Sequence, residues 1–216
     1  SRHPAVDVAD EPPFLGQAVG EATPDGFPDG VTRLDPEDVR RATARYLQRI
    51  AALGTGRAAI VDKNPNNIWL IGWIACAMPD AVVLYAQRDL ADQGLSAFSH
   101  LFPRGFPFTR SLFDLGAYWA LADRVRITFQ DRFPDQVHTV SYEALVADQE
   151  GETRRLLDLC GLDWNPACLD FHNVTNPVHT ASAEQVRRPI HDQSIGLWRA
   201  YDPWLASLRA GAQTAN

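Results

Sequence analysis

The chain contains, from Ala58 to Phe102, the stretch AAIVDKNPNNIWLIGWIACAMPDAVVLYAQRDLADQGLSAFSHLF, in which short apolar runs alternate with polar turns. Ala58–Val61 and Ala81–Tyr85 are apolar runs bounded by turn-forming residues, which predicts two strands. Ile68–Met78 between them is apolar almost throughout, as expected of a helix that covers a sheet. A strand, a helix and a strand in this order predict a βαβ unit with a parallel sheet.

Charged residues follow each of the two predicted strands. In a parallel sheet, ligand-binding residues lie just past the carboxyl ends of the strands. Asp62-Lys63-Asn64-Pro65 follows the first predicted strand, and Gln87-Arg88-Asp89 follows the second. Both strands therefore end beside a cation, which predicts a local site for an anion.

The composition sets the class of protein. The chain has 216 residues, of which 45% are hydrophobic and 22% charged, and this is typical of one soluble globular domain. A net charge of −7 argues against a general nucleic-acid surface or an anionic-membrane surface. The longest apolar run, Ile68–Met78, is too short to span a bilayer, and the sequence shows no signal-peptide pattern.

Lys63 is the only lysine in the chain, while the other nineteen basic residues are arginines. This bias suggests that arginine serves wherever either cation will do, so that the one lysine marks a functional position. The alternative is a surface lysine paired with Asp62. The functional interpretation is favoured, because a solvated position could have carried arginine.

Other candidate residues have a functional and a structural interpretation each. Arg88 with Ser96 two helical turns later could hold a phosphate through a guanidinium and a hydroxyl. Alternatively, Arg88 pairs with Asp89 or Asp92, and Ser96 faces solvent. Tyr142 follows a predicted strand at Val137–Val140 and is either a nucleotide contact or a packed tyrosine.

The remaining chain is predicted to be mostly helical. Asp35-Pro36-Glu37-Asp38 is a strong helix start, and the helix is expected to continue through Val39–Leu53. Leu112–Phe133 and Ile195–Leu208 are also predicted helices. No strand is expected before Asp10. No cluster of His, Cys and Asp has the spacing of a metal site, so no metal is expected.

Several motifs in this order together resemble one protein family. Their pattern is similar to the sulfotransferases that use 3′-phosphoadenosine-5′-phosphosulfate, and within them to bacterial proteins related to tyrosylprotein sulfotransferases. The motifs are Asp62-Lys63-Asn64-Pro65, Pro79-Asp80-Ala81, Arg88-Asp89 with Asp92 and Ser96, Ser141-Tyr142-Glu143 with Leu145-Val146, Leu156–Trp164, Thr180–Ile190 and Trp198–Tyr201. The resemblance implies an α/β fold of the P-loop type, with three layers and a short parallel sheet flanked by helices.

The same resemblance implies a role for individual residues. Arg88 and Ser96 match the pair that holds the 3′-phosphate of the nucleotide, and Tyr142 matches a tyrosine that contacts the nucleotide. Two further cofactor-binding residues lie in a loop, where Arg188 matches a basic residue and Ser182 is a nearby hydroxyl. The residues that match the catalytic positions are Lys63, which would stabilise the transferring sulfuryl group, and Glu11, which would be the general base. The structural alternative for Glu11 is an ordinary surface acid before a Pro-Pro turn.

The resemblance also implies a missing part. Family members open with a strand, a phosphate loop and a helix that bind the 5′-phosphosulfate. The chain begins at a stretch that resembles the segment just after this helix. Residues 1–216 are therefore expected to form a single sulfotransferase-like domain that lacks the strand, loop and helix, and that has no transfer activity on its own.

Two functions are expected as alternatives. The first is a sulfotransferase that moves a sulfuryl group from 3′-phosphoadenosine-5′-phosphosulfate to a hydroxyl acceptor such as protein tyrosine. The second is a non-catalytic nucleotide-binding or scaffold module that keeps only the 3′-phosphate half of the site. The expected partners are the nucleotide and the acceptor, and neither nucleic acid nor a membrane is expected. A homodimer is a candidate assembly. The expected location is the cytoplasm.

Overall fold

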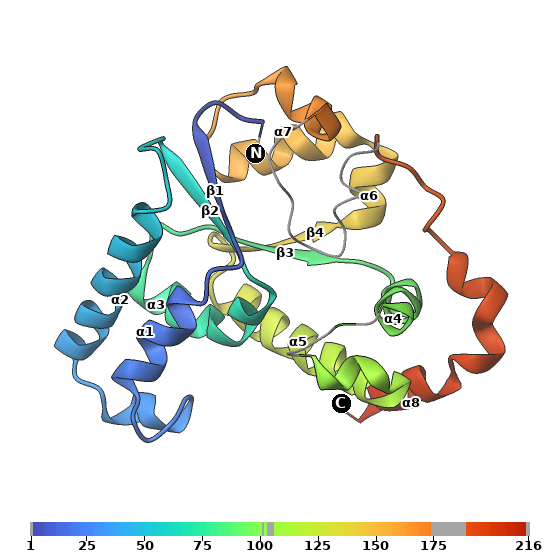
Figure 1. Ribbon diagram of the computed structural model, residues 1–216, viewed down its shortest axis with the longest axis horizontal. Helices are drawn as coiled ribbons and strands as arrows, with labels where there is room; N and C mark the ends of the chain where they lie inside the picture. Colours follow the sequence, from blue (N-terminus) through green and yellow to red (C-terminus); the bar gives the residue numbers. More distant parts are fainter. Residues whose placement is uncertain (1, 101, 103–105, 174–188, 215–216) are drawn as a thin grey trace. The chain divides into compact units, whose positions relative to one another are not determined.

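The computed structural model contains four short strands within the residues that it describes, which are 2–100, 102, 106–173 and 189–214 (Figure 1). The strands are β1 (Val6–Asp10), β2 (Ala59–Lys63), β3 (Val83–Gln87) and β4 (Val137–Ser141). β1 pairs with β2 and β3 pairs with β4, and both pairs are parallel. The predicted α/β class with short parallel sheets flanked by helices is confirmed.

The chain divides into two compact units, and each is described by itself. One unit consists of Ser1–Ala81 and Arg155–Pro189, and the other consists of Val82–Arg154 and Ile190–Asn216. The expectation that residues 1–216 form a single domain stays a prediction.

Helices make up most of the remaining described chain. The α-helices are α1 (Phe14–Ala22), α2 (Pro36–Ala51), α3 (Ile71–Ala77), α4 (Leu90–Ser99), α5 (Leu112–Arg132), α6 (Tyr142–Ala147), α7 (Gln149–Leu159) and α8 (Ala206–Gln213). The 3₁₀ helices are η1 (Asp29–Arg33), η2 (Pro65–Leu70), η3 (Pro107–Arg110), η4 (Pro166–Asn173) and η6 (Leu197–Trp204). The predicted helices that begin after Asp35 and at Leu112 are confirmed.

In the first unit, α1, α2 and α3 pack around one apolar core. Leu15 and Val19 of α1 meet Tyr46 and Ile50 of α2, and Trp73 of α3 joins them. Burial of these large side chains is the main favourable contribution to folding of this unit, at about 1.5–3 kcal/mol for each fully buried one. The core holds α2 against β2, and Lys63 is the last residue of β2.

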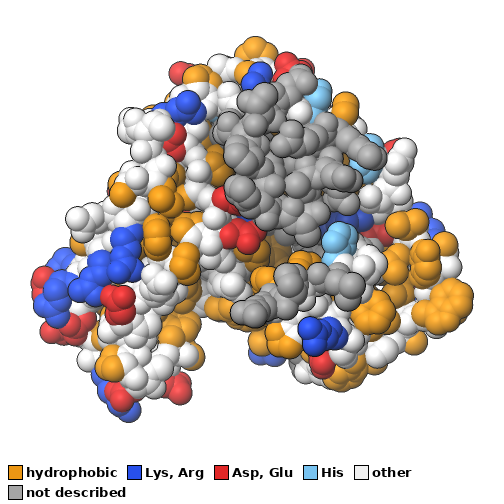
Figure 2. Space-filling view, viewed as in Figure 1, with side chains coloured by type: hydrophobic (Ala, Val, Ile, Leu, Met, Phe, Trp, Pro, Cys, Tyr) orange, Lys and Arg blue, Asp and Glu red, His pale blue; other side chains and the backbone are white. Residues whose placement is uncertain are grey.

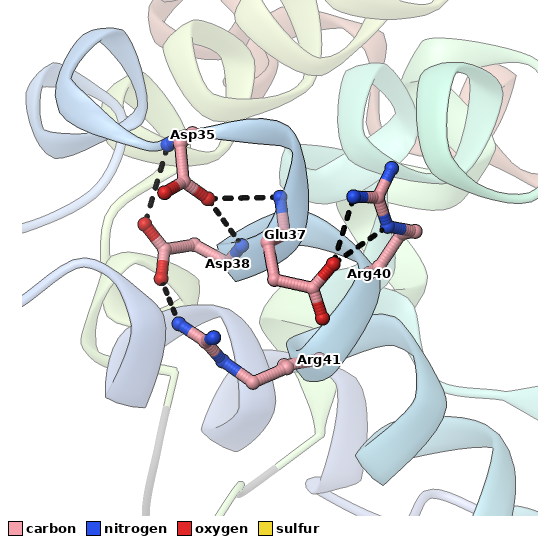
Figure 3. Close-up of polar contacts among 5 residues, drawn as sticks. All are labelled: Asp35, Glu37, Asp38, Arg40 and Arg41. Atoms are coloured by element: carbon pink, nitrogen blue, oxygen red, sulfur yellow. Dashed lines mark hydrogen bonds and ion pairs between the residues drawn. The ribbon is translucent and has the colours of Figure 1, made fainter.

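The start of α2 is fixed by the pattern that predicts it (Figure 3). The Asp35 carboxylate accepts the backbone N–H groups of Glu37 and Asp38, both at 2.8 Å, and the Asp38 carboxylate accepts the N–H of Asp35 at 3.2 Å. This reciprocal arrangement is a capping box, and it occupies helix N–H groups that have no partner within the helix. Arg40 pairs with Glu37 and Arg41 pairs with Asp38 one turn further along.

Asp35→Ala is expected to lower the Tm of the protein by on the order of 2–4 °C, because it removes the acceptor for two helix N–H groups. Glu37→Gln is the control, since it weakens an exposed ion pair and leaves the cap intact, and it should leave Tm almost unchanged. Thermal unfolding followed by circular dichroism measures both. Equal effects of the two substitutions would contradict the role of the cap.

In the second unit, α5 and α8 pack with their backbones close together. A Cβ atom added to Gly116 of α5 would overlap the carbonyl oxygen of Leu208, and one added to Gly211 of α8 would overlap that of Phe113. Leu115, Leu205 and Leu208 are fully buried or nearly so around this contact. On the outside, η6 exposes Leu197, Tyr201 and Trp204, and Figure 2 shows hydrophobic side chains over this part of the unit.

Three predictions about elements are wrong. The first is the absence of a strand before Asp10, because β1 is present and pairs over five residues with β2. The sequence of β1, VDVAD, has only Val6 and Ala9 buried, and this is too few apolar residues to predict a strand. β2 and β3 were expected in one βαβ sheet, but β2 hydrogen-bonds to β1 and β3 to β4.

The third wrong prediction concerns the last helix. Instead of one helix over Ile195–Leu208, the chain forms the 3₁₀ helix η6 and then α8. Pro203 lies inside η6, and proline both lacks an N–H and clashes with the preceding turn of an α-helix. A related difference occurs at Ile68–Met78, where η2 passes into the short helix α3.

Candidate functional site

Lys63 and Glu11 lie together at the carboxyl ends of two adjacent parallel strands. Asp10 is the register partner of Lys63, and the N–H of Glu11 donates to the Lys63 carbonyl at 3.0 Å. The Lys63 ammonium pairs with Asp10 at 2.9 Å and with the Glu11 carboxylate. The structure therefore brings into direct contact the two residues to which the resemblance gives catalytic roles.

The backbone of Glu11 is held in the left-handed region, with φ at +51°. Such a conformation costs a non-glycine residue on the order of 1 kcal/mol, and it persists where surrounding contacts impose it. Two contacts do so here, because the Glu11 N–H bonds to Lys63 and the carbonyl of Pro12 accepts the Asn64 side-chain amide at 3.0 Å. These bonds connect the turns that follow β1 and β2, and so fix the carboxylate beside the ammonium.

Burial alone would lower the pKa of Lys63, but hydrogen bonds and charges from Glu11 and Asp10 outweigh it and raise the pKa above its ordinary value. The side chain remains 47% exposed. Lys63 is therefore a protonated cation at neutral pH, within reach of solvent and of an anionic ligand.

Asp62 does not pair with Lys63, contrary to the structural alternative. Its side chain leaves the strand on the other face, where one carboxylate oxygen accepts the Tyr46 hydroxyl at 3.0 Å and the Asn67 amide at 3.2 Å. The other oxygen is buried and has no hydrogen-bond partner among the described residues. Burial raises the pKa of Asp62, and the two hydrogen bonds reduce this rise. Through the same two hydrogen bonds, Asp62 ties β2 to α2 and η2.

In the second unit, Arg88 and Tyr142 lie at the carboxyl ends of β3 and β4. The central guanidinium carbon of Arg88 is 4.9 Å from the centre of the Tyr142 ring, which is the geometry of a cation–π contact. The Nη2 atom of Arg88 donates to the carbonyl of Ser194. Its Nε atom is buried and, within the described part of the chain, has no acceptor.

Asp89 and Asp92 accept backbone N–H groups, and neither forms with Arg88 the ion pair that the structural alternative requires. Asp89 caps α4 by accepting the N–H groups of Ala91 and Asp92 at 2.9 and 3.0 Å. Among the described residues, Arg88 forms no ion pair with a carboxylate. A buried N–H without an acceptor is rare in proteins, so the Arg88 Nε–H is an exception within the described part of the chain.

Glu143 joins the two strand ends that carry Arg88 and Tyr142. It accepts the backbone N–H of Asp89 at 2.9 Å and the hydroxyl of Ser141 at 3.2 Å. Neither Glu143 nor Asp10, which lies beside Lys63, was predicted from the sequence. Each lies directly next to a predicted residue, and only the pairing of the strands shows that its carboxylate has a positioning role.

The other predicted residues have different outcomes. Ser96 lies in α4 and is partly buried, and its carbonyl accepts the side chains of Ser99 and His100 at 2.8 Å each. A shared phosphate contact of Ser96 with Arg88 stays a prediction. Ser182 and Arg188 lie outside the described residues.

The described residues contain no group of three or more His, Cys, Asp or Glu side chains arranged to hold a metal ion. Within the same part of the chain, no helix combines the length and the apolar composition needed to cross a membrane.

Comparison with known proteins points to one family. Residues 21–166 match the model described as the sulfotransferase family. An uncharacterized protein of Aquifex aeolicus (strain VF5) is 30% identical over 219 residues, which cover 95% of this chain and 29% of that protein. A protein-tyrosine sulfotransferase of Drosophila melanogaster is 27% identical over 184 residues, which cover 78% of this chain and 35% of that protein.

A solved structure shares the fold. A sulfotransferase domain from the curacin biosynthetic pathway matches with a TM-score of 0.51 at 14% identity, covering the whole of this chain and 97% of that chain. The likeness supports a common α/β arrangement. The chain spans only about a third of the length of the curated relatives that it matches.

Proposed function

Because the chain belongs to the sulfotransferase family, as the match over residues 21–166 shows, we propose that it binds 3′-phosphoadenosine-5′-phosphosulfate and takes part in sulfuryl transfer to a hydroxyl acceptor. The observation that carries this proposal is the state of Arg88. Its guanidinium lies over the Tyr142 ring and forms no ion pair with a carboxylate among the described residues.

The 3′-phosphate of the nucleotide is proposed to accept hydrogen bonds from the Arg88 guanidinium. A guanidinium presents five N–H donors in a plane, and one donation to Ser194 leaves the others available to phosphate oxygens. Tyr142 holds the guanidinium plane from one side, while Ser96 provides a hydroxyl from α4. Ser182 and Arg188 are proposed to complete the nucleotide site, on the resemblance alone.

Lys63 and Glu11 carry the chemical step. The acceptor oxygen attacks sulfur and forms the new S–O bond, the bond from sulfur to the 5′-phosphate oxygen breaks, and 3′,5′-adenosine bisphosphate leaves. Negative charge develops on the bridging oxygen, and the Lys63 ammonium stabilises it. The acceptor hydroxyl gives its proton to the Glu11 carboxylate, which the left-handed turn holds beside Lys63.

Tyrosine is the proposed acceptor class, because one relative is a protein-tyrosine sulfotransferase. Transfer of labelled sulfate from the nucleotide to tyrosine-containing peptides and to simple phenols tests the activity. The assay uses the 216-residue chain alone and the chain joined to the strand, phosphate loop and helix of a relative. Nucleotide binding without transfer in either form would favour the non-catalytic binding module.

Nucleotide binding is tested separately by isothermal titration calorimetry. The chain is expected to bind 3′,5′-adenosine bisphosphate at least tenfold more tightly than adenosine 5′-monophosphate, because hydrogen bonds to a charged group contribute about 1.5–3 kcal/mol. Equal affinity for the two nucleotides would contradict a 3′-phosphate site at Arg88.

A further inference from the structure

Asp92 is a buried carboxylate that belongs to the same sequence motif as Arg88, and the proposed mechanism gives it no role. It lies in the first turn of α4 and is only 2% exposed. One oxygen accepts the backbone N–H of Gly196 at 2.6 Å, and the other accepts that of Trp198 at 2.9 Å. The Asp92 carboxylate thus occupies N–H groups at the beginning of η6, more than a hundred residues away in the sequence.

Residues 194–198, which we call the anchor segment, are held at a second point by Arg88. The Ser194 carbonyl accepts a hydrogen bond from the Arg88 guanidinium, while Tyr142 lies against the same guanidinium. Arg88 and Asp92 are four residues apart and contact two ends of one short segment. Arg88 and Asp92 therefore hold the same short segment at two points.

The backbone of the anchor segment explains why the start of η6 needs a hydrogen-bond acceptor from another element. Gly196 has a φ of +74°, in the left-handed region, and it is the last residue of the turn at 193–196 that precedes η6. Gly196 has no side chain of its own to cap η6, and no cap from a neighbouring side chain of that turn is present in the described structure. Asp92 supplies the cap from α4, so its loss frees the anchor segment.

We propose that Asp92 is a positioning residue for the 3′-phosphate site. By holding Gly196 and Trp198, it fixes the Ser194 carbonyl, and this carbonyl orients the Arg88 guanidinium over Tyr142 so that its remaining Nη–H groups are available to phosphate. The inference rests on the proposed function for its consequence in nucleotide binding. The orientation of Arg88 by Asp92 is a property of the protein without nucleotide.

Asp92→Asn is the variant that tests the proposal, because the amide has nearly the same shape but presents N–H donors to one of two backbone N–H groups. The preference for 3′,5′-adenosine bisphosphate over adenosine 5′-monophosphate is expected to fall on the order of tenfold. Asp114→Asn at the start of α5 removes the same charge from an exposed position and should keep the preference.

The variants Arg88→Ala and Asp92→Asn are then combined. If Asp92 acts through Arg88, adding Asp92→Asn to Arg88→Ala costs no further preference for the 3′-phosphate. Independent, additive losses would overturn the proposal, because they would place Asp92 in a separate structural role. Loss of the preference in Arg88→Ala together with its retention in Asp92→Asn would also overturn it, while leaving the proposed function intact.

A readout without nucleotide separates the two proposals. The Nε–H resonance of Arg88 in a ¹⁵N-labelled protein, assigned with Arg88→Lys, should be shifted by the Tyr142 ring and protected from exchange with water. Asp92→Asn should move this resonance toward that of an exposed arginine, whereas Asp114→Asn should not. An unchanged Arg88 resonance in Asp92→Asn would overturn the inference whether or not the protein binds the nucleotide.

Discussion

Arg88→Ala is expected to weaken the binding of 3′,5′-adenosine bisphosphate by about 10–100-fold. The substitution removes both the cation and the planar donors that would meet the 3′-phosphate, and hydrogen bonds to charged groups contribute about 1.5–3 kcal/mol each. Adenosine 5′-monophosphate has no 3′-phosphate, so its affinity should change much less. Calorimetric titration of both nucleotides measures the two effects.

Two further variants make this prediction specific to the site. Arg88→Lys keeps the charge but loses the planar fork and the stacking on Tyr142, so its affinity should lie between those of the original protein and Arg88→Ala. Arg124→Ala removes a cation from the exposed face of α5 in the same unit and should preserve binding. Similar losses in Arg124→Ala and Arg88→Ala would point to a general effect of charge, and would reject a 3′-phosphate site.

Lys63→Ala is expected to lower the rate of sulfuryl transfer by about 10²–10³-fold, as is usual when a group that stabilises transition-state charge is removed. Nucleotide affinity should change little, because this cation acts mainly on charge that develops during the displacement. Single-turnover transfer of labelled sulfate gives the rate, and calorimetry gives the affinity, in whichever form of the chain transfers sulfate.

The contacts of Lys63 supply a second comparison. Lys63→Arg keeps a cation beside Asp10 and Glu11, so it should recover part of the rate that Lys63→Ala loses. A guanidinium is larger and more delocalised than an ammonium, and for this reason full recovery is not expected. An affinity loss in Lys63→Ala as large as that in Arg88→Ala would contradict the division into a binding residue and a catalytic residue.

Local sequence signals determined a large part of this structure. Asp35 caps the start of α2, and Ser141 caps the start of α6. The bounds of β2 and β3 agree with the apolar runs of the central stretch to within two residues. These features depend on residues close together in the chain, where propensity, caps and turn formers act directly. The order of the motifs also identified the family, since Arg88 and Tyr142 each follow a strand, as the resemblance requires.

Only the tertiary structure decided which strand ends meet. β1 is a five-residue strand with two buried residues, too weak a pattern to recognise alone, and its register with β2 brings Glu11 to Lys63 across 52 positions. Asp92 and Gly196 are 104 positions apart, and both look like ordinary polar and turn residues in the sequence. Hydrogen bonds between such distant residues form because packing and strand pairing place them, and no local preference of either residue encodes the partner.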